Sequence, residues 1–298
     1  MAINKAMRAA LSILSYPEID VKKTYLVERE IQKLLSRRLK NPSLYRVWDH
    51  PIPSGVYNVP VRIFKPAGVP KAALLLFFHG GGWVTGTVDS YDGVASVDYR
   101  LAPEHRFPAA PEDCYAAAQE VFRNAGALGV QPEDIVLIGD SAGGNLAAAV
   151  SLMARDRGGF RPRRQILIYP ALASDHSEDS PYPSVRENGT GYLLTAKRVR
   201  DYMALYRSSD EDLVNPYFAP LHASGLEGQP DTLLITAEYC PLRDEGEAYG
   251  QRLREEGGSV EIHRIPDALH GYFSLPVRFS LVKQTYEIIN RFLERSHE

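Results

Sequence analysis

Cysteine is scarce in this sequence, and long apolar runs and an excess of one charge are absent. Its 298 residues include two cysteines, Cys114 and Cys240, which are too few for a disulfide framework. No run approaches the ~18 consecutive apolar residues of a membrane span, and a net charge of −3 gives no electrostatic footprint for nucleic acid. The composition, 44% hydrophobic and 24% charged, instead allows one large α/β domain with an embellishment, or two small domains.

The first 45 residues are predicted to form an amphipathic helical arm. Lys5 and Arg8 precede a short apolar patch that polar residues interrupt, and no small-residue cleavage site follows. We therefore expect a helix rather than a signal peptide, and a cytoplasmic location. The arm is either a packing element or a lid over an acyl pocket, and the pattern leaves both open. Pro17 separates its two segments, whose apolar residues at helical spacing are Ala6, Ala10, Leu11 and Leu14, then Val27, Ile31, Leu34, Leu35 and Leu39.

Beyond residue 45, strands alternate with helices, which predicts a mostly parallel sheet covered on both faces. Residues 45–64 alternate around Pro-Ser-Gly and predict a hairpin of edge strands. Asp98, Arg100 and Glu104 are expected to form a structural ion network. The expected strands that follow are 72–78, 94–99, 135–138, 165–169, 232–238 and 260–265. The expected helices are 111–124, 145–155, 244–256 and 276–295, with an irregular insertion from 170 to about 208.

Residues 135–145 predict a strand, a sharp turn and a helix, with a serine at the apex of the turn. Gly139 and Gly143 flank Ser141 in the pattern G-x-S-x-G. The turn holds the serine in a strained conformation, and a Cβ on either glycine would crowd it. The helix that follows directs free N–H groups at an oxyanion forming near the serine. We predict that Ser141 is a nucleophile; a glycine-rich turn before a phosphate-binding helix is the alternative.

Three consecutive glycines follow the strand expected at 72–78. Such a run lets the backbone turn its N–H groups toward the place of a reacting carbonyl. We expect the backbone N–H groups of Gly80, Gly81 and Ala142 to form an oxyanion hole. The alternative is a loop that is merely flexible. The presence of the serine elbow later in the chain favours the oxyanion hole over this alternative. His79 is expected to be a structural hydrogen-bonding residue.

His270 stands in Asp-Ala-Leu-His-Gly, just after the last expected strand. Catalytic loops gather at the carboxyl ends of parallel strands, and the order nucleophile, acid, histidine is the one expected of this architecture. We therefore predict that His270 is the general base for Ser141. His263 lies inside a strand and is expected to be a packing residue.

Several of these stretches resemble the hormone-sensitive-lipase-like branch of the α/β-hydrolases. The stretches are 79–83, 98–110, 139–148, 241–249 and 270–273, with weaker similarity at 50–65 and 214–237. The resemblance implies an α/β-hydrolase fold with an eight-stranded sheet, in which a core of residues 46–298 carries a cap. The cap would consist of the arm 1–45 and an insertion at about 175–208. It also implies hydrolysis of short-chain carboxylic esters through an acyl-enzyme, without metal or cofactor.

One departure from this branch concerns the catalytic acid. Its members carry Asp-Pro-Leu-Arg-Asp-Glu after the seventh strand, the first Asp being the triad acid, and this sequence has Cys240 there. An Asp accepts from the histidine Nδ1–H, fixes the tautomer and stabilises the imidazolium. A thiol with an ordinary pKa of about 8.5 is neutral at pH 7 and accepts weakly. Glu238, Asp244 and Asp267 are candidate substitutes that the sequence leaves open.

A second departure is the short segment between Trp83 and Val94. Two parallel neighbours need a crossover of roughly a dozen residues or more, usually a helix, and the glycine loop occupies much of residues 79–93. We expect one face of the sheet to be less covered beside residues 84–97. Either the strand 94–99 is displaced, or another segment or a second subunit covers the gap, which leaves a homodimer open.

Two functions of different classes fit these residues. The first is a serine carboxylesterase acting on a small-molecule ester, with Ser141 as nucleophile and His270 as base, slowed by Cys240. The second is a catalytically silent protein that binds a small ligand in the acyl pocket, as the gibberellin receptors do within this family. The retained serine, histidine and residues 79–82 favour the enzyme, because a pure binding protein does not need all of them. A third possibility that the sequence leaves open is an esterase whose sequence was altered deliberately or accidentally.

Overall fold

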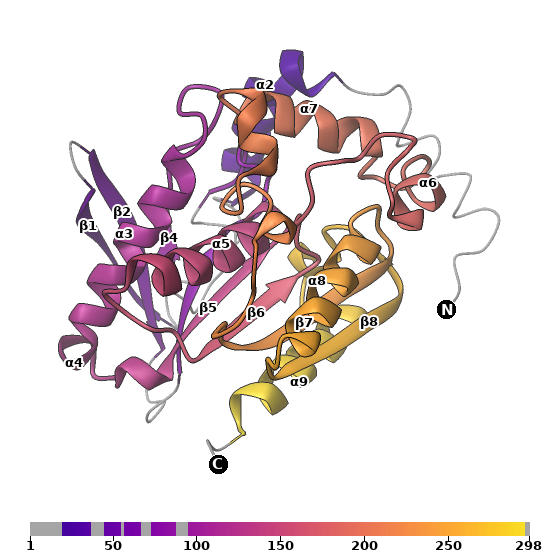
Figure 1. The fold of residues 1–298 in the computed structure, drawn as a ribbon. Helices are drawn as coiled ribbons and strands as arrows, with labels where there is room; N and C mark the ends of the chain where they lie inside the picture. The colour runs from indigo at the N-terminus through magenta and orange to yellow at the C-terminus, as the bar shows by residue number, and fades with distance from the viewer. Residues whose placement is uncertain (1–19, 37–44, 55–56, 67–72, 88–94, 296–298) are drawn as a thin grey trace.

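The structure is a computed structural model, and it describes residues 20–36, 45–54, 57–66, 73–87 and 95–295. Its centre is one eight-stranded sheet in the order β1-β2-β4-β3-β5-β6-β7-β8 (Figure 1). β1 pairs antiparallel with β2, β2 pairs antiparallel with β4, and the other neighbours are parallel. The predicted α/β-hydrolase fold class is therefore confirmed. The strands are β1 (Tyr45–Ser54), β2 (Tyr57–Pro66), β3 (Leu74–Phe78), β4 (Ala95–Val97), β5 (Ile135–Asp140), β6 (Arg164–Ile168), β7 (Asp231–Tyr239) and β8 (Val260–Leu269).

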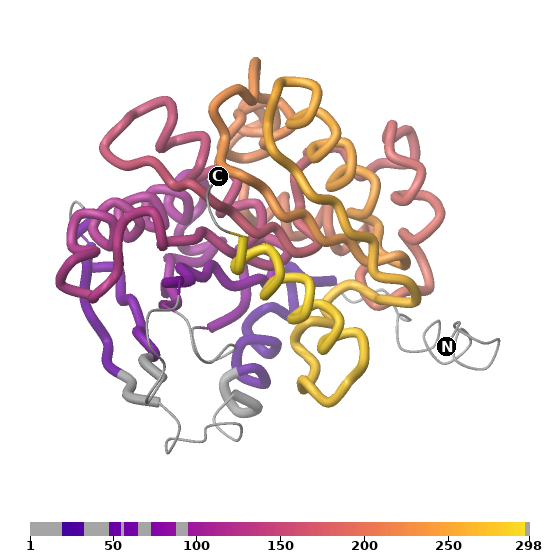
Figure 2. Tube along the Cα trace, turned by 90° about the horizontal axis from the view of Figure 1, so that it is seen from below, coloured from indigo at the N-terminus to yellow at the C-terminus, as the bar shows by residue number. Residues whose placement is uncertain are grey.

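Helices cover the sheet and the carboxyl ends of its strands. The α-helices are α2 (Val21–Ser36), α3 (Ala109–Arg123), α4 (Ala125–Leu128), α5 (Ala142–Arg157), α6 (Pro183–Glu187), α7 (Ala196–Tyr206), α8 (Arg243–Glu255) and α9 (Ser280–Leu293). The 3₁₀ helices are η2 (Pro132–Asp134), η3 (Asp210–Val214), η4 (Pro220–His222) and η5 (Tyr272–Ser274). Figures 1 and 2 show α3, α5 and α8 on one face and α9 on the other, and α2 contacts α7 above the carboxyl ends.

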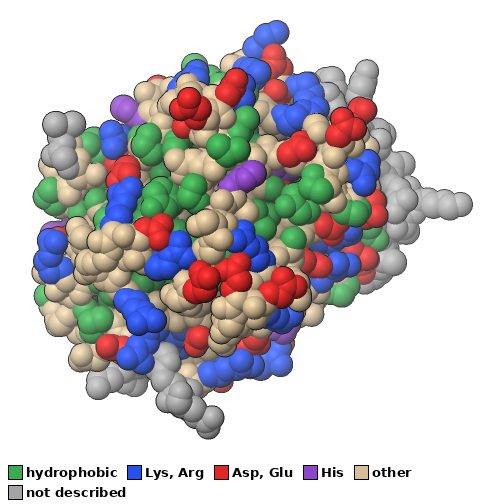
Figure 3. Space-filling view, viewed as in Figure 1, with side chains coloured by type: hydrophobic (Ala, Val, Ile, Leu, Met, Phe, Trp, Pro, Cys, Tyr) green, Lys and Arg blue, Asp and Glu red, His purple; other side chains and the backbone are tan. Residues whose placement is uncertain are grey.

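The helices of the described residues show no membrane span, and the face seen in Figure 1 carries charges of both signs. No helix among the described residues combines the length and apolarity that a bilayer crossing requires. Figure 3 shows Lys and Arg side chains interspersed with Asp and Glu over the face seen in Figure 1.

β5 is buried along its whole length and supports the turn that follows it. Its apolar residues Ile135, Val136, Leu137 and Ile138 are at most 3% exposed. A continuous apolar run is what a parallel strand between two helical layers requires. Burying each of these side chains contributes about 1.5–3 kcal/mol, so the strand gives the turn after Asp140 a rigid base.

Two segments differ from the sequence-based expectation. β8 extends to Leu269 instead of ending near residue 265, and a register shift with β7 lets Tyr239 pair with Leu269. His270 therefore follows directly on a paired strand. The insertion expected to be irregular contains the helices α6 and α7.

We expected one face of the sheet to be less covered beside residues 84–97. For the described residues this expectation is wrong. β4 is not displaced, because its three residues pair with β3 on one side and β2 on the other. Val84, Thr85 and all of β4 are at most 1% exposed. Residues 88–94 lie outside the described residues, as does the first segment of the N-terminal arm.

Candidate active site

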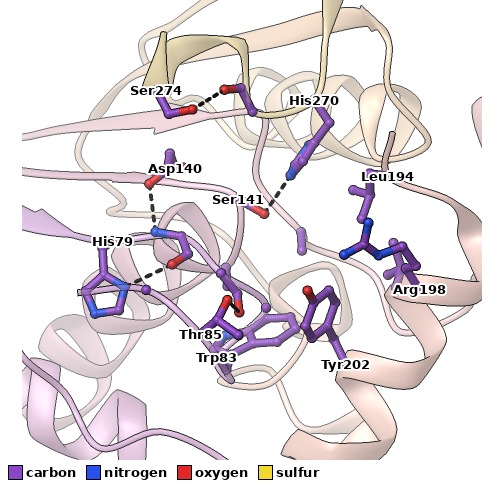
Figure 4. A pocket seen from close by; sticks show the side chains of 18 of the residues that line it. His79, Trp83, Thr85, Asp140, Ser141, Leu194, Arg198, Tyr202, His270 and Ser274 are labelled. Carbon is purple, nitrogen blue, oxygen red and sulfur yellow. Dashed lines mark hydrogen bonds between the residues drawn. The ribbon is translucent and has the colours of Figure 1, made fainter. Parts of the chain in front are cut away.

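A cavity of about 520 Å³ lies at the carboxyl ends of β3 and β5 (Figure 4). The glycine loop, Ser141 and His270 line it from the sheet side. Glu28 and Gln32 of α2, and residues of α7, line it from the opposite side. The cavity therefore brings together the serine, the histidine and the glycine loop that the sequence singled out.

The turn at Ser141 has the strained geometry that the flanking glycines predict. Ser141 has φ 56° and ψ −119°, a region that non-glycine residues rarely adopt. A Cβ on Gly143 would collide with the Phe78 carbonyl, and one on Gly139 with the Gly143 backbone. The serine N–H donates to the Ile168 carbonyl at 2.9 Å, which ties the turn to β6. Only glycine therefore fits at the positions two residues before and two residues after this serine.

His270 reaches the serine from the end of β8. Its Nε2 lies 2.9 Å from Ser141 Oγ, the contact drawn as a dashed line in Figure 4. The Tyr169 ring lies against the imidazole, with 4.7 Å between the ring centroids. The geometry is that of a hydroxyl held on a histidine that can take its proton.

Cys240 lies on the other side of the same imidazole. Its Sγ is 3.1 Å from His270 Nδ1 and also accepts from the Leu242 N–H at 3.4 Å. The residue is completely buried, and burial raises the pKa of the Cys240 thiol above its ordinary range. A neutral thiol therefore occupies the place at which a triad acid would contact the histidine.

Two of the three candidate carboxylates are hydrogen-bonded to other groups. Glu238 Oε2 accepts from the Asp267 N–H at 2.6 Å, and Asp244 accepts from the Ser184 N–H at 2.7 Å. Within the described part of the chain, the hydrogen bonds of the His270 ring are those to Ser141 and to the cysteine. No substitute carboxylate reaches the histidine in this structure.

The electrostatic surroundings of His270 disfavour its protonation. Burial, and then the positive charge of Arg198, lower the pKa of His270 to about 3 from an ordinary value near 6.5. The imidazole is therefore neutral at physiological pH and can accept a proton. The imidazolium that would form has no neighbouring negative charge to stabilise it.

The glycine loop is attached to the elbow through its first glycine. The Gly80 N–H donates to Asp140 Oδ1 at 2.7 Å, so it is not free to receive an oxyanion, which corrects the expected donor set. The N–H groups of Gly81, Gly82 and Ala142 have no partner among the described residues. Gly81 and Gly82 have φ of 121° and 61°, conformations that glycine adopts readily.

His79 holds the start of the loop, as the sequence led us to expect. Its Nδ1 lies 2.9 Å from the Gly80 carbonyl, and the Tyr99 hydroxyl donates to the His79 carbonyl at 2.7 Å. The two rings are stacked with centroids 4.3 Å apart. Burial lowers the pKa of His79, so a neutral ring is stacked in the core behind the loop.

Helix α2 holds the far end of the glycine loop, which the sequence analysis missed. Arg29 Nε donates to the Val84 carbonyl and its Nη2 to the Ala102 carbonyl, both at 2.7 Å. Gln32 Oε1 accepts from the Gly86 N–H at 2.8 Å. The spacing of Arg29 and Gln32 places them on one face of a helix, but nothing in the sequence names their partners.

The ion network expected around Arg100 is arranged differently. Arg100 pairs with Asp113 at 2.7 and 2.8 Å, and Glu104 pairs with Arg29 of α2 at 2.9 Å. Arg100 and Glu104 therefore belong to two separate pairs, because each turns to a helix that precedes or follows it. The second pair adds to the attachment of α2.

Asn145 is a further residue that the sequence analysis did not single out. Its Oδ1 accepts from Trp83 Nε1 at 3.3 Å, and its Nδ2 donates to the Ala171 and Phe218 carbonyls at 2.8 Å. One buried amide thus joins the glycine loop to two loops at the carboxyl ends of the strands. Its position one turn into α5 was the only available signal.

The family model described as an alpha/beta hydrolase fold matches residues 75–274. The chain belongs to the α/β-hydrolase family. This α/β-hydrolase is 35% identical over 263 residues to an arylesterase of Saccharolobus solfataricus, covering 84% of each chain. It is 38% identical over 245 residues to the carboxylesterase NlhH of Mycobacterium tuberculosis, covering 76% of this chain and 74% of the relative.

Solved structures agree with this membership. An esterase from the hyperthermophilic archaeon Pyrobaculum calidifontis superimposes on the α/β-hydrolase with a TM-score of 0.86 and 35% identity. That superposition covers 99% of this chain and 98% of the other. The similarity therefore extends over nearly the whole length of both chains.

Proposed function

We propose that this α/β-hydrolase is a serine carboxylesterase that hydrolyses short-chain carboxylic esters through an acyl-enzyme. The observation that carries the proposal is the 2.9 Å contact between Ser141 Oγ and His270 Nε2 inside a 520 Å³ cavity. Relatives named as an arylesterase and a carboxylesterase support the same reaction class.

The reaction would use the residues as follows. Ser141 Oγ attacks the ester carbonyl carbon while its proton passes to His270 Nε2, and the C–O bond to the alcohol then breaks. His270 returns the proton to the departing alcohol oxygen. It next takes a proton from a water that attacks the acyl carbon, which releases the acid and restores the serine.

The oxyanion would be held by backbone N–H groups. Gly81 and Ala142 keep the role expected from the sequence, and Gly82 replaces Gly80, whose N–H is bonded to Asp140. Donors held in place before the reaction stabilise the charge that develops on the carbonyl oxygen.

The thiol at Cys240 would slow this reaction in two ways. A carboxylate only accepts hydrogen bonds, whereas a thiol both donates and accepts, so Cys240 does not force the proton of His270 onto Nδ1. In the other tautomer Nε2 carries the proton and cannot accept one from the serine. The neutral sulfur also leaves the imidazolium without a counter-charge.

The cap would consist of the arm 1–45 and the insertion at about 175–208. Glu28 and Gln32 of α2 line the cavity together with Val199 and Tyr202 of α7. This lining supports a lid function for α2 over a packing function alone.

The second candidate is a silent ligand-binding protein, and the buried neutral thiol is the observation that favours it. Such a protein would keep the cavity and lose turnover. Measurements of turnover and of covalent labelling of the serine separate the esterase from the silent protein.

The test combines turnover with covalent labelling. The purified protein should release p-nitrophenol from p-nitrophenyl butyrate and become labelled on Ser141 by a fluorophosphonate, as located by mass spectrometry. Ser141→Ala protein should lose the labelling and most of the turnover. Labelling of another residue, or unchanged turnover in Ser141→Ala, would reject the proposed mechanism. Ligand binding without turnover or labelling would favour the silent ligand-binding protein.

A further inference from the structure

The cavity wall contains an arginine whose hydrogen-bonding capacity is not used up. Arg198 lies in the first turn of α7, and Figure 4 shows its guanidinium pointing into the cavity. Its Nη1 donates to the Leu193 carbonyl at 3.3 Å, and its Nη2 is 3.6 Å from Glu28 Oε1. Its Nε is buried and has no hydrogen-bond partner in the part of the chain that is described.

Five arginines of the described residues, all outside the cavity, are paired much more tightly. Each of them places two guanidinium nitrogens on one carboxylate at distances between 2.6 and 2.9 Å. The pairs are Arg29–Glu104, Arg62–Asp49, Arg100–Asp113, Arg157–Glu112 and Arg264–Glu247. Two-point binding of a carboxylate is the geometry that a guanidinium fits best. Arg198 lacks such a partner.

Glu28 does not fill this role. Its carboxylate accepts from the Thr24 hydroxyl at 3.1 Å and from the Tyr202 hydroxyl at 3.2 Å. The hydrogen bonds of the Glu28 carboxylate are therefore made to hydroxyl groups and not to the arginine. The longer distance of 3.6 Å leaves a weak ion pair and no hydrogen bond between Glu28 and Arg198.

The charge of Arg198 also acts on the catalytic centre. It is the second cause, after burial, that lowers the pKa of His270. The thiol of Cys240 offers no compensating negative charge. An anion bound at the guanidinium would offset the positive field at the imidazole and favour the protonated form that the reaction passes through.

We propose that Arg198 selects esters that carry a second, ionised carboxylate, which the guanidinium binds while the ester carbonyl lies at Ser141. The inference rests on the proposed esterase function. The substrates would be half-esters of short dicarboxylic acids or esters of carboxylate-bearing alcohols, for which a 520 Å³ cavity is large enough. The substrate would then bring part of the negative charge that Cys240 does not supply.

The first experiment compares charged and neutral esters of matched size. The p-nitrophenyl half-ester of glutaric acid is paired with p-nitrophenyl butyrate, which places the carboxylate on the acyl side. 4-Acetoxybenzoate is paired with phenyl acetate, which places it on the alcohol side. We expect kcat/KM to favour the charged member of one pair by about 10- to 100-fold, the range of a charge-assisted hydrogen bond.

Two variants test the role of the guanidinium in opposite directions. Arg198→Met should lower the charged-to-neutral ratio at least tenfold, and Arg198→Lys should keep part of it. Glu28→Gln should raise the ratio, because it removes the competing carboxylate. Arg200→Met, a matched loss of charge on the same helix outside the cavity lining, should leave the ratio unchanged.

The outcomes separate this inference from the function on which it rests. A ratio near one for both pairs in an active, fluorophosphonate-labelled enzyme would overturn the inference and leave the esterase intact. A fall of the ratio in Glu28→Gln as well as in Arg198→Met would show that the pair is only a structural link, and would overturn it too. If turnover is undetectable, binding to Ser141→Ala protein decides: monomethyl glutarate should bind at least tenfold more tightly than methyl butyrate, and equal binding would reject the proposal.

Discussion

The two ring nitrogens of His270 face contrasting partners. On the Nε2 side, Ser141 Oγ lies at 2.9 Å, presented by a strained turn that two glycines permit. On the Nδ1 side, Cys240 Sγ lies at 3.1 Å, at the position for which the family resemblance implies an aspartate. In the proposed mechanism, one side has the geometry and the chemistry of a triad, and the other has only the geometry.

This contrast separates what the fold requires from what the reaction requires. The serine side depends on backbone conformation, because a Cβ on Gly143 would strike the Phe78 carbonyl. The thiol side depends on the charge of one side chain. The backbone there still directs the Leu242 N–H at the sulfur, so the site is shaped to receive an acceptor. A thiol in the place of the proposed acid would therefore change the chemistry and leave the architecture in place.

Among single substitutions, the largest expected effect comes from restoring the charge with Cys240→Asp. The new carboxylate would accept from His270 Nδ1–H and from the Leu242 N–H, fix the tautomer and stabilise the imidazolium. We expect kcat to rise by about 10³- to 10⁴-fold, since loss of the acid in a comparable triad costs about 10⁴. KM should change little, because the position does not line the cavity. Steady-state kinetics at pH 7–8 measure both.

Cys240→Ser is the matched control for this prediction. It keeps a small neutral group that both donates and accepts, so kcat should stay within about tenfold of the original. A rise of less than tenfold in Cys240→Asp would reject the interpretation of a missing acid.

The second effect is the loss of turnover in Ser141→Ala, and its size depends on the thiol side. In a serine protease, removing the serine costs about 2 × 10⁶ in kcat and removing the acid alone about 3 × 10⁴. Members of a triad act as a unit, so Ser141→Ala should cost only about 10²-fold here. The same change in a Cys240→Asp background should cost about 10⁵- to 10⁶-fold. Equal losses in the two backgrounds would show that the cysteine site is not coupled to the serine.

Local patterns sufficed for the elements around the serine and for most strands. The elbow could be predicted because strand, glycines and helix are consecutive in the chain, and each constrains the next. The position of His270 near Ser141 could be predicted because this histidine follows the last strand of a parallel sheet. The pairing of Cys240 with His270 came from the family resemblance, and no pattern in the residues themselves indicated it.

Contacts between distant segments could not be predicted. The bond from Gly80 to Asp140 joins residues 60 apart and changed the expected oxyanion donors. Arg29 and Gln32 had no sequence pattern that named their partners, since a polar helix face also suits plain exposure to water. The burial of β4 was not predicted, because the short connection before this strand led us to expect an exposed sheet face beside it.

The third prediction concerns pH and tests the charge difference directly. With a pKa of about 3, His270 stays unprotonated from pH 5 to pH 8, so kcat/KM should vary by no more than about threefold over that range. In Cys240→Asp the neighbouring carboxylate raises the pKa of the histidine, and activity at pH 5 should fall about tenfold below that at pH 8. An acid limb near pH 6.5 in the unchanged protein would contradict the neutral surroundings of the imidazole.

The same group should make folding acid-sensitive. Because the pKa of His270 lies below its unfolded value of about 6.5, the unfolded chain binds the extra proton as the pH falls from 6.5 toward 3. Stability is therefore lost in that window, by about 2 kcal/mol at pH 5 from this residue. Urea unfolding should show a smaller loss between pH 7 and pH 5 in Cys240→Asp than in the unchanged protein.

The smallest expected effect lies on the serine side, at the attachment of the glycine loop to α2. Arg29→Ala removes the donors to the Val84 and Ala102 carbonyls, so the loop that carries the proposed oxyanion donors loses one support. We expect kcat to fall about fivefold with a smaller change in KM, since each lost hydrogen bond contributes about 1 kcal/mol and the bonds of Asp140 and Gln32 to the loop remain. Lys22→Ala is the control, because its weak ion pair joins the same helix to Asp201 of α7 and not to the loop. Equal losses of kcat in the two variants would mean that α2 acts on the cap alone, and a fall confined to Arg29→Ala would assign the helix to the oxyanion side of the site.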